Sequence, residues 1–150
     1  MVDFNLRKGR SDDVPQVFDL IMELAVFEKA PDQVSNSPDQ LRRDGFGEQP
    51  IFGLLVAEAE AVIVGISLYY FRYSTWKGKR LYLEDLIVTE PWRGRGVGEA
   101  LLEATIAEAR ANQCTGLMWQ VLDWNEPAIN FYKKFGARFD SEWVNVHVDF

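Results

Sequence analysis

Apolar residues recur along the chain with two different periods, and these periods predict where helices and strands lie. Between Ser11 and about Lys29 they return every three or four residues, which is typical of an amphipathic helix with one buried face. Pro15 suits the first turn of that helix, and the acidic residue Glu28 falls on its apolar stripe. A second helical pattern covers residues 97–112. The sequence therefore predicts two main helices.

Shorter apolar runs without the helical period predict strands. They cover residues 2–8, 51–59, 61–73, 80–88, 116–122 and 138–149. Short helices are expected over 38–44 and after Asn125, where Gly136 suits a left-handed helix end. Strands 80–88 and 116–122 flank one helix, so they are predicted to run parallel. The prediction is one α/β domain over 1–150, with a mixed, mostly antiparallel sheet flanked by helices.

Composition and charge exclude several classes of function. The chain has 150 residues, 47% of them hydrophobic, and a formal net charge of -7, which argues against binding to nucleic acid. No apolar run reaches the roughly 20 residues of a membrane-spanning helix, and the first residues lack the layout of a secretory signal. We expect a cytoplasmic protein without a membrane partner. One cysteine, Cys114, and one histidine, His147, predict no Cys/His metal site and no Ser-His-Asp triad.

The segment Arg93-Gly94-Arg95-Gly96-Val97-Gly98 lies between the predicted strand 80–88 and the helix 97–112. Glycines let the backbone turn with its N–H groups pointing inward, and a helix N-terminus adds partial positive charge. The pattern predicts a cradle for an anion such as pyrophosphate, and a glycine-rich turn without a ligand is the alternative. Glu99 after the last glycine excludes a Walker A loop and departs from the Rossmann fingerprint.

This loop resembles the Arg/Gln-x-x-Gly-x-Gly/Ala coenzyme A loop of the GNAT acetyltransferase superfamily. Further segments resemble the diamine acetyltransferases, which include spermidine/spermine acetyltransferase and its thialysine-acetylating relatives. They are Glu23-Leu24-Ala25, Asp44-Gly45-Phe46-Gly47-Glu48, Tyr69-Tyr70-Phe71, Leu81-Tyr82-Leu83-Glu84-Asp85, Trp124-Asn125-Glu126-Pro127 and Asn130-Phe131-Tyr132. The resemblance implies a GNAT fold splayed between the fifth and sixth main strands, acetyl-CoA as cosubstrate, and a homodimer.

The resemblance also implies two sets of binding residues. The residues implied for the cofactor are Leu86, Ile87, Val88, Arg93, Gly94, Arg95, Gly96, Val97, Gly98, Glu99, Asn125, Glu126, Pro127 and Ala128. Those implied for the amine acceptor are Phe27, Glu28, Glu84, Met118, Trp119 and Gln120. Within the first set, backbone groups of Leu86 and Val88 are expected to face the thioester and the pantetheine arm. The alternative for Glu28 is the exposed end of its helix.

The predicted chemistry needs a carboxylate, because an amine attacks a thioester only as the free base. A lysine-like ammonium has a pKa of about 10.4, so deprotonation near pH 7 costs about 4.6 kcal/mol. A carboxylate can bind the cation and take its proton, directly or through water. Glu84 and Asp85 are adjacent in strand 80–88, and a regular strand directs them to opposite faces. The resemblance favours Glu84 as acceptor ligand and base, and a salt bridge or cap contact is the alternative for each of the two residues.

Tyr132 lies in the short helix after Asn125, where spacing alone favours a core ring. The resemblance makes it the acid that protonates the departing coenzyme A thiolate. A phenol with a pKa of about 10 gives its proton to a thiolate near 8.5 at a cost of roughly 2 kcal/mol. Tyr132 is therefore predicted to donate a hydrogen bond to the sulfur as negative charge develops.

The expected function is direct transfer of acetyl from acetyl-CoA to a primary amine of a small cationic acceptor. A polyamine, a diamine or a thialysine-like amino acid is the expected acceptor class. Two alternatives remain open at this point. One is a non-catalytic sensor module that binds coenzyme A, and the other is a GNAT enzyme that acts on protein amines.

Overall fold

The computed structural model describes residues 3–150, which form two compact units. The first unit ends at Trp119 and the second is Gln120–Phe150, and each is described by itself. The prediction of a single domain stays a prediction. No helix in the described part of the chain combines the length and the apolar character needed to cross a membrane.

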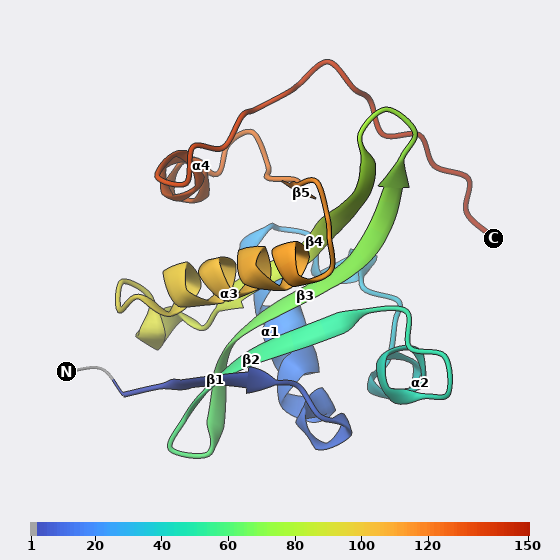
Figure 1. Ribbon diagram of the computed structural model, residues 1–150. Coiled ribbons are helices and arrows are strands. Elements are labelled where there is room, and N and C mark those ends of the chain that lie inside the picture. Colours follow the sequence, from blue (N-terminus) through green and yellow to red (C-terminus); the bar gives the residue numbers. More distant parts are fainter. Residues whose placement is uncertain (1–2) are drawn as a thin grey trace. The chain divides into compact units, whose positions relative to one another are not determined.

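A twisted five-stranded sheet forms the centre of the first unit (Figure 1). Its strands lie side by side in chain order: β1 (Asn5–Lys8), β2 (Gly53–Ala59), β3 (Val62–Ser74), β4 (Gly78–Val88) and β5 (Leu117–Met118). The first four strands are antiparallel to their neighbours, and β5 runs parallel to β4. The mixed, mostly antiparallel sheet and the parallel pair are therefore confirmed.

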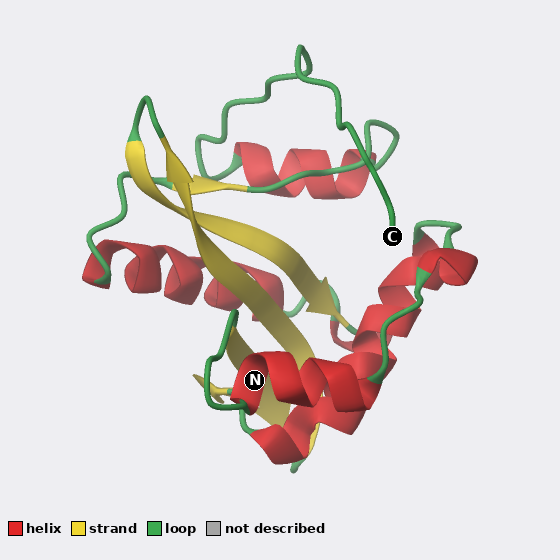
Figure 2. Ribbon diagram, turned by 90° about the vertical axis from the view of Figure 1, so that its right-hand side faces the viewer, coloured by secondary structure: helices red, strands yellow, loops and turns green. Residues whose placement is uncertain are grey.

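Helices cover both faces of this sheet (Figure 2). The helices α1 (Val14–Phe27) and α2 (Pro38–Phe46) lie on one face, and α3 (Val97–Ala111) lies on the other. Pro15 stands in the first turn of α1, as predicted. The hydroxyl of Ser37 accepts a hydrogen bond from the Gln40 N–H at 3.1 Å, which caps the start of α2.

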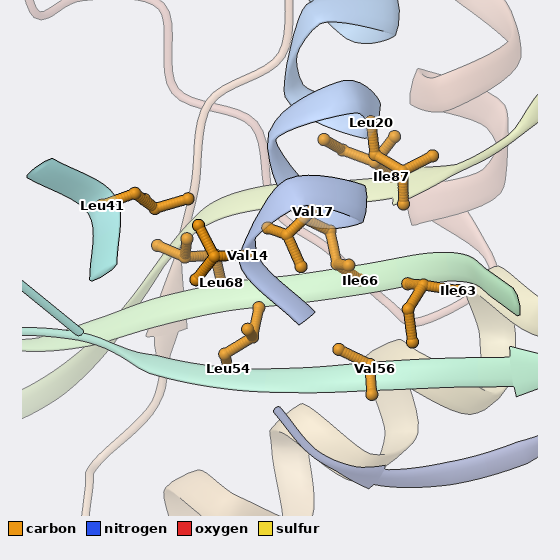
Figure 3. Packing of buried hydrophobic residues seen from close by; sticks show 10 residues of the cluster. All are labelled: Val14, Val17, Leu20, Leu41, Leu54, Val56, Ile63, Ile66, Leu68 and Ile87. Atoms are coloured by element: carbon orange, nitrogen blue, oxygen red, sulfur yellow. The ribbon is translucent and has the colours of Figure 1, made fainter. Parts of the chain in front are cut away.

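The main core lies between α1, α2 and the sheet (Figure 3). Its buried members are Val14, Val17, Leu20, Leu41, Leu54, Val56, Ile63, Ile66, Leu68 and Ile87. On the opposite face, the hydroxyls of Ser67 and Thr105 lie 2.7 Å apart and join β3 to α3. Alternate residues of β3 thus point to opposite faces of the sheet. Ile66 and Leu68 are directed toward α1, and Ser67 is directed toward α3.

Two strand predictions near the C-terminus differ from the structure. The strand predicted over 116–122 is only Leu117–Met118, and the strand predicted over 138–149 is wrong because those residues have no regular structure. An alternating pattern gives a strand its two faces, but the strand forms only where a partner completes its hydrogen bonds. In the second unit, α4 (Glu126–Lys133) is followed by Gly136 at φ +70°, as predicted.

The sheet opens along β4. Its ladder with β5 covers only Leu81 and Tyr82, so from Leu83 to Val88 the outer edge of β4 has no partner strand among residues 3–150. The resemblance implied that the sheet splays between a fifth and a sixth strand. The described residues form no sixth strand, and the sheet splays between β4 and β5 instead.

Candidate functional site

A β-bulge in β4 places two acidic side chains on one face of the sheet. Leu68 of β3 pairs with Asp85, and the next residue, Tyr69, pairs with Leu83, so Glu84 is an extra residue in the ladder. The side-chain alternation of β4 shifts at this point. The prediction that Glu84 and Asp85 point to opposite faces is therefore wrong.

Neighbouring contacts identify the shared face as the one that α1 covers. Leu68 belongs to the core beneath α1, so its partner Asp85 faces α1 as well. Tyr70 lies two residues after Leu68 and shares this face. Its hydroxyl donates a hydrogen bond to Glu84 Oε1 at 3.0 Å, and its ring stacks on Tyr82 with 5.3 Å between the centroids. Both carboxylates thus lie beside an aromatic pair.

Asp85 and Glu28 line a pocket of about 210 Å³ at the C-terminal end of α1. The remaining lining is mostly apolar and consists of Ile21, Leu24, Ala25, Ala30, Gln33 and Val34. Burial, together with the charges of Glu84 and Glu28, raises the pKa of Asp85 to about 7. Burial also raises the pKa of Glu28. A carboxyl group with a pKa near 7 can accept and release a proton at neutral pH.

The acceptor-site residues predicted from β5 onward are Met118, Trp119 and Gln120, and none of them is among the residues that line this pocket. Met118 is exposed, and its sulfur accepts a weak hydrogen bond from Arg72 Nη1 at 3.0 Å. Trp119 is half-buried. Gln120 belongs to the second unit, where its side-chain amide donates to Asn145 Oδ1 at 3.0 Å. The acceptor-binding roles of these three residues stay predictions.

The glycine loop leads from β4 into α3 and borders open space. Gly94 and Gly96 have φ values of +75° and +84°, a conformation that favours glycine. A Cβ atom at either position would meet no atom within 4 Å. The first backbone hydrogen bond of α3 joins the Ala100 N–H to Gly96 O at 3.1 Å, so the N–H groups of residues 97–99 have no helical acceptor. This geometry fits a bound pyrophosphate.

The two arginines of the loop differ in their contacts. Arg93 Nε donates to Val88 O at 2.9 Å, and Arg93 Nη2 lies 3.3 Å from the Glu23 carboxylate. The same guanidinium lies 5.7 Å from the ring centroid of Phe27, which is partly exposed. Arg95 is exposed, lies 4.9 Å from the ring centroid of Trp92, and forms no ion pair with a carboxylate of residues 3–150. Arg95 is therefore the cation of this loop that is better placed for an incoming phosphate.

The predicted cofactor residues of β4 lie on its open section. Ile87 packs into the core beneath α1, so only its main chain can reach a ligand. Leu86 and Val88 are half-buried and pair with Ser67 and Gly65 of β3. The outer edge of β4 at Leu86 and Val88 has no partner strand among the described residues. An extended ligand needs such an open edge to bind beside a strand.

The remaining predicted residues lie in the second unit, at α4. The side chain of Asn125 accepts a hydrogen bond from the Ala128 N–H at 3.3 Å and caps the helix, with Pro127 in the first turn. Tyr132 is buried, and its ring centroid lies 5.5 Å from that of Phe131. Their roles toward cofactor and leaving group stay predictions.

Sequence reasoning missed the contacts of two residues. Tyr70 binds Glu84, and the alternation of β3 could have indicated that it shares a face with Leu68. Glu23 contacts the segment before the glycine loop, and no periodicity or motif spacing marks this contact, because it joins residues about 70 positions apart.

Comparisons with known proteins show similarity to acetyltransferases. The model of the Acetyltransferase (GNAT) family matches residues 16–137. A thialysine N-epsilon-acetyltransferase of Bos taurus is 42% identical over 141 residues, which cover 89% of this chain and 83% of that protein. A spermidine/spermine N(1)-acetyltransferase-like protein of Homo sapiens is 38% identical over 89% of this chain, but over only 20% of its own length. The solved structure of a tetramutant protein from Bacillus halodurans is 27% identical, with a TM-score of 0.78 and coverage of 96% of this chain and 99% of that one.

Proposed function

Because the chain belongs to the acetyltransferase (GNAT) family and is an N-acetyltransferase, we propose that it moves acetyl from acetyl-CoA directly to a primary amine of a small cationic acceptor. Polyamines, diamines and thialysine-like amino acids are the proposed acceptor class. The names of the Bos taurus and Homo sapiens relatives support this class.

The bulge at Glu84 is the observation that carries this proposal. It brings Glu84 and Asp85 to the same face of the sheet, and Glu28 lines the same pocket as Asp85. Three carboxyl groups in one region attract a cation and repel an anionic acceptor. A pocket of about 210 Å³ suits a small molecule better than a protein segment.

We assign different roles to the two carboxylates of the bulge, Glu84 and Asp85. Glu84 is exposed and oriented by the Tyr70 hydroxyl, so it suits the first contact with the ammonium group. Asp85, with its pKa raised to about 7, suits the uptake of the proton, a role expected of Glu84 from the sequence. The proton still moves from a group with a pKa of about 10.4, and removal of the ammonium from water lowers that value and eases the step.

When bound, acetyl-CoA supplies an activated acetyl thioester. The N–H groups of residues 97–99 suit its pyrophosphate, and Arg95 adds positive charge nearby. The main chain of Leu86 and Val88 is proposed to align the arm and polarise the carbonyl. Residues 125–128 are proposed to contact the cofactor. Tyr132 is proposed to donate a hydrogen bond to the departing sulfur.

The test is acetyl-CoA-dependent acetylation of an acceptor panel, followed as thiol release with product identification by mass spectrometry. We expect turnover with spermidine, a short diamine or thialysine. Hydroxyl analogues of the same length provide matched controls, because they lack the basic nitrogen. Tight coenzyme A binding without turnover of any amine would favour a sensor module, and turnover of only protein amines would favour a protein acetyltransferase.

Direct transfer has its own test, because Cys114 is the single cysteine and could otherwise carry an acyl group. The variant Cys114→Ala is expected to keep the wild-type rate, and the protein is expected to show no acetylated form in the absence of acceptor. A homodimer is also proposed, and sedimentation velocity at micromolar concentration tests it.

A further inference from the structure

The carboxylate of Glu23 contacts the segment that joins β4 to the glycine loop at three points. Its Oε1 accepts a hydrogen bond from the Thr89 hydroxyl at 2.8 Å. Its Oε2 accepts one from the Glu90 N–H at 3.1 Å and one from Arg93 Nη2 at 3.3 Å. Both oxygens are used, so the orientation of the carboxylate is fixed relative to residues 89–93.

Arg93 continues this connection from α1 to the sheet. Its Nε donates to Val88 O at 2.9 Å, at the end of β4. Its guanidinium also lies 5.7 Å from the ring centroid of Phe27, which stands one helical turn after Glu23 on the same side of α1. Helix α1, the end of β4 and the first residue of the loop are thus held together by one set of side-chain contacts.

These contacts contribute more to geometry than to stability. Glu23 and Arg93 keep 34% and 45% of their side-chain surface exposed, and an exposed ion pair of this kind adds little to the free energy of unfolding. The following residues Gly94 and Gly96 have left-handed φ values, and glycine permits many other conformations. A loop of this kind binds an anion best when the chain before it is already fixed, because ordering on binding costs affinity.

We propose that Glu23 is a positioning residue for coenzyme A. It fixes residues 89–93, so that the N–H groups of the glycine loop are presented to the pyrophosphate before the ligand arrives. Arg93 acts as the link in this arrangement, and Arg95 provides the charge that meets the phosphates. The inference rests on the proposed function, because it assumes that this loop binds coenzyme A.

The test compares Glu23→Ala with Asp19→Ala, which removes an exposed acid from the same helix. Calorimetry gives the Kd for coenzyme A, and steady-state kinetics give the KM values for acetyl-CoA and for the amine. We expect Glu23→Ala to raise the Kd and the KM for acetyl-CoA about tenfold, as expected for lost hydrogen bonds to a charged group. The KM for the amine and the melting temperature should stay close to those of the wild type, and Asp19→Ala should change none of these values.

Two further variants separate positioning from general damage. Glu23→Gln keeps an amide that can bond to Thr89 and Glu90 but loses the charge opposite Arg93, so it should recover part of the lost affinity. In Glu23→Ala combined with Arg93→Ala, the loss should be smaller than the product of the single losses, because both changes break the same connection. Amide hydrogen exchange of Trp92 and Arg93, whose N–H groups donate to Thr89 O and Glu90 O, should be faster in Glu23→Ala, without a matching change in β3.

The outcomes separate this inference from the proposed function. Wild-type affinity for coenzyme A in Glu23→Ala overturns the inference and leaves the proposed function intact. Loss of affinity that Glu23→Gln does not relieve, together with faster exchange throughout β3, assigns Glu23 a purely structural role and also overturns it. A wild-type protein that does not bind coenzyme A overturns both.

Discussion

The two halves of β4 belong to one continuous strand but differ in their surroundings. Gly78–Leu83 pairs with β3, and at Leu81 it also meets β5. Glu84–Val88 begins with the bulge, and its outer edge has no partner strand among residues 3–150. Leu81 is fully buried, whereas Glu84 is exposed. Both halves supply buried side chains, such as Leu81 and Ile87, but only the bulged half leaves main-chain and acidic groups available for chemistry.

The largest expected effect comes from removing the proton acceptor of the bulged half. Asp85→Asn should lower kcat/KM for the amine by about 10² to 10³-fold, because an amide cannot take up the ammonium proton. The KM for acetyl-CoA should change less than twofold. Asp39→Asn, an exposed acid of α2, is the matched control. A full rate in Asp85→Asn would assign the proton transfer to another group.

A pair of substitutions contrasts the two halves directly. Leu81→Ala should lower the free energy of unfolding by about 2 to 5 kcal/mol, because it leaves a cavity at a fully buried site. Glu84→Gln should change that free energy by less than about 0.5 kcal/mol and lower kcat/KM for the amine by about tenfold or more. Urea unfolding and kinetics below the melting temperature measure both. If both variants lost mainly stability, the division of β4 would be wrong.

Ionisation of Asp85 is expected to change stability and activity in opposite directions. Its pKa is about 7 in the folded protein, above the ordinary value of 3.8, so between these values the folded state holds a proton that the unfolded state has lost. Stability should therefore fall as pH rises from about 4 to about 7, whereas activity should rise as the carboxylate forms.

Asp85→Asn tests this linkage. Relative to the wild type, it should raise the free energy of unfolding at pH 8 by on the order of 1 to 2 kcal/mol, after allowance for partial exposure to solvent. At pH 3 it should have little effect, because below the ordinary pKa of 3.8 both states hold most of the proton. If Asp85→Asn stabilised the protein equally at both pH values, the charge of Asp85 would not be the cause of the stabilisation.

The smallest expected effect concerns the hydroxyl that orients Glu84. Tyr70→Phe removes the hydrogen bond to Glu84 and keeps the ring stacked on Tyr82. The KM for the amine should rise about threefold, in line with one partly exposed hydrogen bond. Tyr73→Phe, at an exposed tyrosine of the same strand, is the control and should leave the KM unchanged.

Much of the first unit could be predicted from periodicity and turn residues. The apolar stripe of α1 and the nearly continuous apolar runs of β2 and β3 can be seen in the sequence, and the buried positions of these elements match them. The tight turn between these strands lies at Glu60 and Ala61, which have φ values of +52° and +66°. Local residue types are enough to determine elements of this kind, to within a residue or two.

The bulge could not be predicted, because the sheet is covered on both faces. Leu81, Leu83, Asp85 and Ile87 alternate as if they shared one face. In fact Leu83 pairs with Tyr69 on the α3 side, whereas Ile87 lies in the core beneath α1. When both faces are apolar, a shift of one residue leaves the hydrophobic pattern unchanged. The joint placement of Glu84 and Asp85 therefore becomes visible only in the register with β3.

The open edge of β4 also bears on how the protein avoids aggregation. An unpaired strand edge can add a strand from another molecule and begin a growing sheet, and bulges and charged side chains are common defences against this. Glu84 is the bulged residue, and Asp85 beside it is acidic as well. The groups proposed to receive the substrate would then also help to keep neighbouring copies from stacking edge to edge.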